Sequence, residues 1–97
     1  MILEIAQYTA QPGKADELAA GLLRGAEIIR RAKGCRSVTP RRQIEDREKF
    51  IMAIEWDTLD DHIVGFRGSP QFAEYRSHLA GLYIEPIVAP HYEAIGG

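Results

Sequence analysis

The sequence contains a single cysteine, Cys35, among its 97 residues. One cysteine cannot form a disulfide within the chain, and the lack of a disulfide framework is typical of proteins from a reducing compartment. The sequence also lacks the Cys and His spacing of a zinc site, so Cys35 is expected to be a small buried hydrophobic residue. These absences predict a cytoplasmic protein that is not stabilised by disulfides.

Long apolar runs are absent as well. No stretch approaches the ~18 apolar residues that a membrane helix needs, and the segment MILEIAQYTA lacks the layout of a signal peptide. No membrane partner is therefore expected. The hydrophobic content of 45% and the charged content of 27% are ordinary for a globular protein. The length predicts one domain, residues 1–97, which is small enough to gain from burial against a partner subunit.

Turn signals and hydrophobic periodicity divide the chain into a regular order of elements. Strands are expected at 2–10, 35–44, 49–57 and 87–95, a long helix at 14–33, and a split second helix at 59–66 and 70–83. The order βαββαβ, with helices on one face of an antiparallel four-stranded sheet, predicts an α+β, ferredoxin-like fold. Pro40 cannot donate a ladder hydrogen bond, so the second strand is expected at an edge or at a bulge.

The first helix contains two glycines, Gly21 and Gly25, in or beside its apolar stripe. Each costs about 1 kcal/mol of helix propensity relative to alanine. Close packing of this helix against the sheet is expected to explain that cost. Gly34 is expected to be the C-cap of the helix.

The third strand is apolar on both of its faces. One face carries Phe50, Met52, Ile54 and Trp56, and the other carries Ile51, Ala53 and Glu55. Because the helices of one chain can cover only one face, the other is expected to be covered by a second copy of the chain. The sequence therefore predicts a homodimer, with strand 87–95 contributing to the contact.

Four motifs along the chain resemble those of one known family. They are Pro-Gly-Lys after the first strand, Lys-Gly-Cys before the second, EWDTLDDH at 55–62 and SPQF at 69–72. In their order and spacing they resemble the antibiotic biosynthesis monooxygenase family, of the dimeric α/β-barrel superfamily. The resemblance implies two protomers with their sheets face to face, and a ligand cavity between each sheet and its own helices. The family's activities include cofactor-free oxygenation of quinols and anthrones, haem degradation, and non-oxidative handling of small metabolites.

Haem degradation does not fit this chain. The haem-degrading relatives use an Asn, a Trp and an iron-binding His at positions that fall here on Ala6, Phe66 and Arg76, and a guanidinium cannot ligate iron. The histidines His62, His78 and His91 share no metal-ligand spacing, and no Gly-rich nucleotide motif is present. The protein is therefore expected to be colourless, with no metal and no cofactor.

The predicted cavity contains a base and a cation. His62 and Arg76 lie on helix stripes that face the sheet, and the resemblance implies a small aromatic substrate that reacts with molecular oxygen. A neutral histidine can take the proton of a phenol or anthrone, and an arginine can hold the resulting anion. Trp56, Phe66, Phe72, Tyr75 and Tyr8 are candidate walls that stack on the substrate.

Other interpretations of these residues stay open. His62 can be a hydrogen-bonded core residue, Trp56 can be packing alone, and Arg76 can pair with Glu4 or Glu55. His91, next to Pro90, is expected to face the partner or solvent. A non-oxidative metabolite-binding protein or isomerase of the same superfamily is the alternative function.

The charges of the chain are unevenly distributed. Residues 30–49 carry eight of the twelve Lys and Arg against three acidic residues, hence a net charge of +5, whereas the rest has a net charge of −7. Such a segment can bind an anionic partner, but basic side chains also protect an edge strand from aggregation. The isoelectric point of about 5.9 argues against a nucleic-acid partner.

Overall fold

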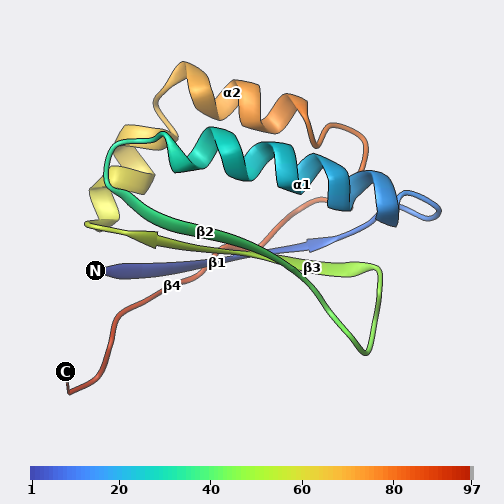
Figure 1. Cartoon of the computed structure of the whole chain (residues 1–97), viewed down its shortest axis with the longest axis horizontal. Coiled ribbons are helices and arrows are strands. Elements are labelled where there is room, and N and C mark those ends of the chain that lie inside the picture. Colours follow the sequence, from blue (N-terminus) through green and yellow to red (C-terminus); the bar gives the residue numbers. More distant parts are fainter. Residues whose placement is uncertain (97) are drawn as a thin grey trace.

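A four-stranded antiparallel sheet, with helices on one side of it, forms the frame of the molecule (Figure 1). The structure is a computed structural model that describes residues 1–96. Its elements in chain order are β1 (Ile2–Thr9), α1 (Ala15–Arg30), β2 (Cys35–Arg42), β3 (Lys49–Trp56), η1 (Asp61–Phe66), α2 (Pro70–Ser77) and β4 (His91–Tyr92). The strand order is β2-β3-β1-β4. The predicted α+β, ferredoxin-like fold is confirmed.

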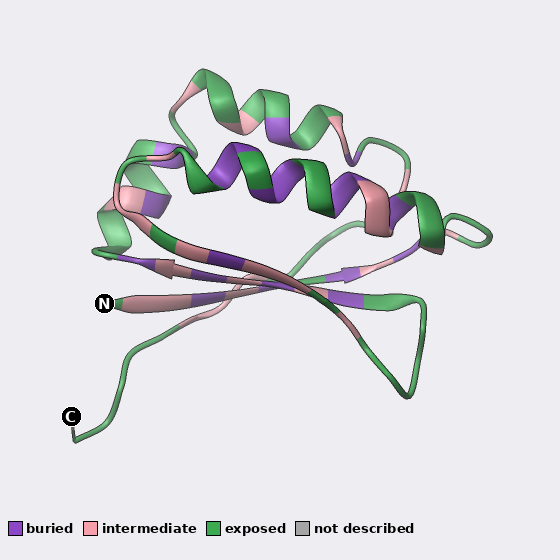
Figure 2. Ribbon diagram, in the orientation of Figure 1, coloured by how far each residue is buried: buried purple, intermediate pink, exposed green. Residues whose placement is uncertain are grey.

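The core lies between the sheet and the helices. On β3, Phe50, Met52, Ile54 and Trp56 are all buried and point towards the helices, as their alternation predicts. From above them, α1 contributes Leu18, Leu22 and Ile29, which are at most 1% exposed. Each such side chain stabilises the fold by roughly 1.5–3 kcal/mol relative to an exposed position. In Figure 2 the buried residues are seen along α1 and along the strands beneath it.

The two glycines of α1 allow close approach of α2, not of the sheet as predicted. A Cβ atom at Gly25 would lie 2.6 Å from Cε1 of Tyr75, and one at Gly21 would lie 2.6 Å from the carbonyl oxygen of His78. Both distances are too short for real contacts. The glycines therefore set the helix–helix distance and, through it, the position of the Tyr75 ring.

Replacing Gly25 with alanine is expected to lower the free energy of unfolding by about 1–3 kcal/mol, because the methyl group overlaps the Tyr75 ring. This loss should exceed the gain in helix propensity. Chemical denaturation measures it. Leu23→Ala, at an exposed position of the same helix, is the control and should change stability by less than about 0.5 kcal/mol. A Gly25→Ala variant at least as stable as the parent would contradict the close approach.

The last strand is much shorter than the predicted range 87–95. Only His91–Tyr92 forms regular ladder structure, with one further bridge between Gln7 and Val88. Upstream, the β1 amides of Ile5 and Gln7 donate to the carbonyls of Pro90 and Val88. Proline has no N–H to donate in return. The segment therefore follows β1 mainly as a hydrogen-bond acceptor.

The helices also end earlier than predicted. The α2 helix stops at Ser77, whose hydroxyl donates to the Glu74 carbonyl, and Gly81 then has a left-handed φ of 75°. The chain continues in tight turns instead of reaching residue 83. Likewise α1 ends at Arg30, before the predicted residue 33. Gly34, with φ of 82°, makes the turn into β2 and is not the helix cap.

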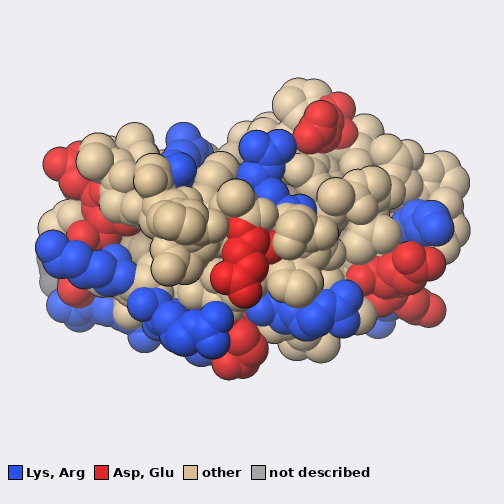
Figure 3. Space-filling view, turned by 90° about the horizontal axis from the view of Figure 1, so that it is seen from above, with Lys and Arg blue, Asp and Glu red and all other residues tan. Residues whose placement is uncertain are grey.

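The basic segment 30–49 covers an edge of the sheet. The β2 strand is an edge strand with an irregular register between Cys35 and Ser37; the expectation drawn from Pro40 is thus confirmed. Two of its arginines pair with acidic residues, Arg36 with Asp57 and Arg42 with Asp16. Seen from above, lysines and arginines gather along one edge of the molecule with acidic groups between them (Figure 3).

Within residues 1–96, no helix has the length and apolarity that crossing a membrane requires.

Candidate functional site

A cavity of about 420 Å³ lies between the sheet and the helices. Aromatic and aliphatic side chains together form most of its wall. The aromatic lining residues are Tyr8, Phe66, Phe72, Tyr75 and Tyr83, and the charged or titratable ones include Glu4, His62, Arg67, Arg76 and Glu85. The size falls within the range of small-molecule sites, roughly 300–1,000 Å³. An apolar space with a few converging polar groups can hold and orient a small organic molecule.

The structure brings most of the predicted site residues together. His62 and Arg76 both line the cavity, as do the candidate walls Tyr8, Phe66, Phe72 and Tyr75. Trp56 does not line it. Its side chain is fully buried behind His62, with the two rings stacked at a centroid distance of 5.2 Å and an angle of 18°. Trp56 therefore supports the imidazole from behind and leaves the other side of the site to the ligand.

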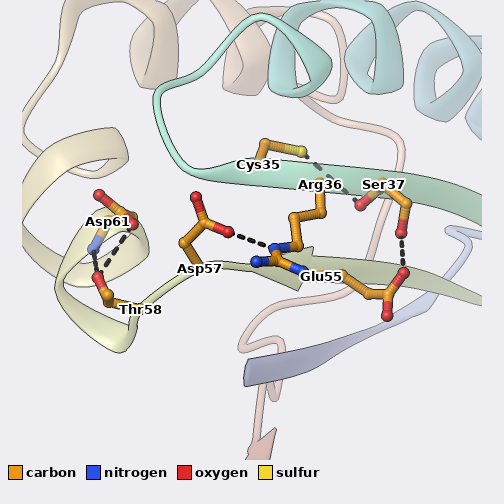
Figure 4. A network of polar contacts seen from close by, with 7 residues as sticks. All are labelled: Cys35, Arg36, Ser37, Glu55, Asp57, Thr58 and Asp61. Carbon is orange, nitrogen blue, oxygen red and sulfur yellow. Dashed lines mark hydrogen bonds and ion pairs between the residues drawn. The ribbon is translucent and has the colours of Figure 1, made fainter. Parts of the chain in front are cut away.

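The position of His62 depends on the turn that follows β3. Within this turn, the Thr58 hydroxyl accepts from the Asp61 amide at 3.2 Å and donates to the Asp61 carboxylate at 3.0 Å (Figure 4). Asp57 pairs with Arg36 of β2. The short helix η1 begins directly after this network, with π-type bonding from the Arg67 amide to the His62 carbonyl. The Thr58–Asp61 hydrogen bonds and the ion pair thus hold the turn from which η1 begins.

The adjoining ends of β2 and β3 are tied by a hydrogen bond. The Ser37 hydroxyl donates to the Glu55 carboxylate on the outer face of the sheet (Figure 4). Cys35 is half-buried, packs against the core and donates weakly to the Ser37 carbonyl. The sequence predicted a small buried residue here. Its place at the end of an edge strand leaves one side of it uncovered.

A cluster of Glu4, His62 and His91 lies at one end of the cavity. His62 Nδ1 lies 2.8 Å from His91 Nε2, and His62 Nε2 lies 3.4 Å from Glu4 Oε1. The same Glu4 oxygen accepts a hydrogen bond from the Trp56 indole at 2.9 Å. Sequence reasoning placed His91 towards a partner or solvent, and this is wrong. Because β4 pairs with β1 so that His91 is opposite Glu4, its ring lies beneath η1.

Burial controls the charges of this cluster. Burial raises the pKa of Glu4, while the hydrogen bond from Trp56 and the charge of Arg67 act in the opposite direction. Burial, with smaller effects of Arg67 and His91, lowers the pKa of His62 to about 4. Burial, followed by Arg67, also lowers the pKa of His91. Both imidazoles are therefore uncharged at neutral pH and have lone pairs to offer.

The two arginines of the cavity are free of the acidic partners considered for Arg76. Glu4 is bound to Trp56, and Glu55 accepts from Ser37. Arg76 itself is exposed and lies with its guanidinium carbon 5.7 Å from the centre of the Phe72 ring. Arg67, which sequence reasoning missed, follows η1 and lines the same cavity. The cavity is therefore suited to a ligand with negative charge at its mouth.

Two buried tyrosine hydroxyls meet on the cavity wall. Tyr8 of β1 and Tyr75 of α2 share a hydrogen bond of 2.5 Å. Burial raises the pKa of Tyr8 to about 12 and raises that of Tyr75 well above its ordinary value. In the unfolded chain both ionise near pH ~10. The stability that the pair contributes is thus complete below that pH and is lost as pH rises through the folded pKa values.

Replacing Tyr8 with phenylalanine is expected to reduce the loss of stability between pH ~10 and ~12 by about 2–3 kcal/mol, because one raised pKa is removed. Denaturation at a series of alkaline pH values measures this loss, and phenolate absorbance follows the titration itself. A Tyr8→Phe variant with the same alkaline loss as the parent would show that Tyr8 is not the buried titrating group.

The sequence profile of the antibiotic biosynthesis monooxygenase family matches residues 1–77, most of the chain. This chain belongs to that family. A crystal structure of a Bordetella bronchiseptica protein assigned to the family is 33% identical, with a TM-score of 0.90 over 97% of this chain and 96% of that one. The uncharacterised protein YczJ of Bacillus subtilis (strain 168) is 28% identical over 95 residues, 98% of this chain and 100% of YczJ.

A more distant structure shares the fold of this family member. SnoaB from Streptomyces nogalater, named as a cofactor-independent oxygenase, is 19% identical, with a TM-score of 0.77 over 96% of this chain and 91% of SnoaB. At this identity the likeness shows the fold alone. The sequence profile thus shows the family, and the solved structures share its fold. The chemistry of this member depends on its own cavity.

Proposed function

We propose that this protein is a cofactor-independent monooxygenase that oxidises a small, electron-rich aromatic molecule such as a quinol or an anthrone. The single observation that carries the proposal is the cavity, which combines a neutral buried histidine, an arginine and aromatic walls. Membership of the family supports the reaction class. The name of SnoaB, with the same fold, supports independence of a cofactor.

The reaction balances without an external reductant. An anthrone and O2 give an anthraquinone and water, and a hydroquinone and O2 give a hydroxyquinone and water. In each case the substrate supplies all four electrons, one oxygen atom forms the new C–O bond and the other leaves as water. The protein has only to generate the electron-rich anion, hold it, and return a proton to the departing oxygen.

His62 is the proposed proton acceptor and Arg76 the proposed anion-binding group. The imidazolium that forms on His62 would be stabilised by the Glu4 carboxylate at 3.4 Å. The anionic oxygen of the substrate would be held by Arg76, whose side chain is already aligned over Phe72. Tyr8, Phe66, Phe72 and Tyr75 would surround the rings, and Trp56 would keep the His62 ring in place.

Oxygen consumption tests the proposal directly. Chelator-treated protein would be mixed with a panel of hydroquinones and anthrones, and O2 uptake above the spontaneous rate would be recorded. Catalysed uptake with at least one of them is expected. If ligands bind and are isomerised, or are only retained, without O2 uptake, the alternative of a non-oxidative isomerase or binding protein replaces the oxygenase.

We further propose that two chains pack sheet to sheet. The face of the sheet away from the helices carries Leu3, Ile5, Ile51 and Ala53, which are half-buried, and Tyr92, which is 52% exposed. No helix of residues 1–96 lies on that side in Figure 1. Light scattering at micromolar concentration is expected to give the mass of a dimer. A monomer there would contradict this assembly.

A further inference from the structure

We propose that Glu4, His62 and His91 form a binding site for one first-row divalent metal ion, such as Zn²⁺ or Co²⁺. Each of the three residues offers a ligand atom, and these atoms lie within 4.8 Å of one another. Two imidazoles and one carboxylate are a donor set that zinc, cobalt and iron(II) accept. The site goes beyond the oxygenase reaction, which requires no metal.

The spacing of the histidine nitrogens suits a shared metal. His62 Nδ1 and His91 Nε2 face each other at 2.8 Å. Two nitrogens bound to one tetrahedral ion at about 2.1 Å are about 3.4 Å apart, only somewhat farther than this. To hold the ion, the two rings would separate slightly and turn so that both lone pairs point at it. A shift of the Glu4 side chain then brings its oxygen within bonding distance.

Three separate parts of the fold hold the ligands in place. Glu4 and His91 are opposite each other on neighbouring strands, and His62 approaches them from η1 above the sheet. The Trp56 indole donates to Glu4, which orients the carboxylate as outer partners of metal ligands commonly do. Glu4 and His62 are each only 4% exposed. The three elements therefore hold the ligand atoms close together before any ion arrives.

The surroundings favour an open, exchangeable site over a structural one. Three protein ligands leave at least one coordination position vacant, and Glu4 and His62 line the cavity through which water or a ligand could fill it. The nearby positive charge of Arg67, which lines the same cavity, opposes a cation. Arg67 is exposed and its charge is screened by water, so it should weaken binding without preventing it.

Metal binding and the proposed base role of His62 exclude each other. An ion on His62 Nδ1 takes the lone pair of the neutral ring and leaves its hydrogen on Nε2, so the ring no longer accepts the substrate proton. The metal is thus expected to inhibit the oxygenase. Binding itself can be measured without any substrate. Failure of the metal site is therefore distinguishable from failure of the proposed reaction.

The test uses the tag-free chain after chelator treatment. Titration with Co²⁺, followed by its visible d–d absorption, is expected to saturate at one ion per chain, and calorimetry with Zn²⁺ should give the same stoichiometry. His91→Ala is expected to weaken binding about 10-fold or more, and Glu4→Gln similarly. Arg67→Gln should tighten binding, because it removes the opposing charge.

Two matched controls separate this site from other metal ligands of the chain. His78→Ala and Cys35→Ser change the remaining histidine and the single cysteine, and both should bind Co²⁺ as the parent does. If Glu4→Gln fails to fold, the Co²⁺ titration of His91→Ala tests the site instead, because His91 is only half-buried. No saturable one-to-one binding at millimolar Co²⁺, or unchanged binding by His91→Ala, would overturn the proposal.

Discussion

Replacing His62 with alanine is expected to lower the turnover of an aromatic substrate by about 10²-fold or more. His62 lines the cavity, its ring is uncharged at neutral pH because burial lowers its pKa, and Glu4 lies beside it at 3.4 Å. The steady-state rate of O2 uptake, measured with substrate in excess, reports the loss. Because the defect is in proton transfer, the Michaelis constant should change less than the turnover number.

The control for this variant is His78→Ala. His78 follows α2, is half-buried, and does not line the cavity. Its replacement should leave the rate within about two-fold of the parent. Removal of His62 exposes one face of Trp56 and could disturb the fold. Circular dichroism therefore has to establish that both variants fold. A folded His62→Ala variant with an unchanged rate would remove His62 from the mechanism.

Replacing Arg76 with alanine is expected to weaken the binding of an ionised ligand by about 10-fold, the effect of losing one charge-assisted hydrogen bond. The guanidinium is exposed, so solvent screening keeps the effect at this lower end. A neutral analogue should lose much less, because it offers no anion. Arg76→Lys should restore binding only in part if the contact is bidentate. Titration of a phenol series of graded acidity measures these differences.

The control for Arg76 is Arg24→Ala, which removes an exposed arginine of α1 that is not part of the cavity wall. Both variants lower the net charge of the protein by one unit. Arg24→Ala therefore separates the effect of a local contact with the ligand from that of the overall electrostatic field. Equal losses for ionised and neutral ligands with Arg76→Ala would indicate that the side chain only packs against Phe72.

The sequence predicted the fold well because local signals and global packing agree in most of the chain. The alternation on β3 identifies the buried face, and Pro40 correctly places β2 at an edge. The errors occur where tertiary contacts override local pattern. A glycine on the apolar stripe of a helix can pack against a sheet or against another helix, and the sequence is the same in both cases. The Tyr75 ring beside Gly25 shows that here it packs against a helix.

The candidate site was predictable in part for the same reason. Helical spacing shows that His62 and Arg76 face the sheet, and both line the cavity. The cluster with Glu4 and His91 was not predictable, because His62 and His91 are 29 positions apart and meet only through the pairing of β4 with β1. The prediction of no metal site relied on sequence spacing, which cannot report side chains that strand pairing brings together. A glutamate among apolar residues on β1 was the one available signal.

The central claim is that the substrate itself reduces O2 in a cavity without a cofactor. The most direct test is turnover under ¹⁸O2 by chelator-treated protein, with the product analysed by mass spectrometry. The account predicts one ¹⁸O atom in each product molecule, the other in water, and one O2 consumed per substrate oxidised. A product that acquires its oxygen only from water, or turnover that requires an added reductant, flavin or metal ion, would contradict it.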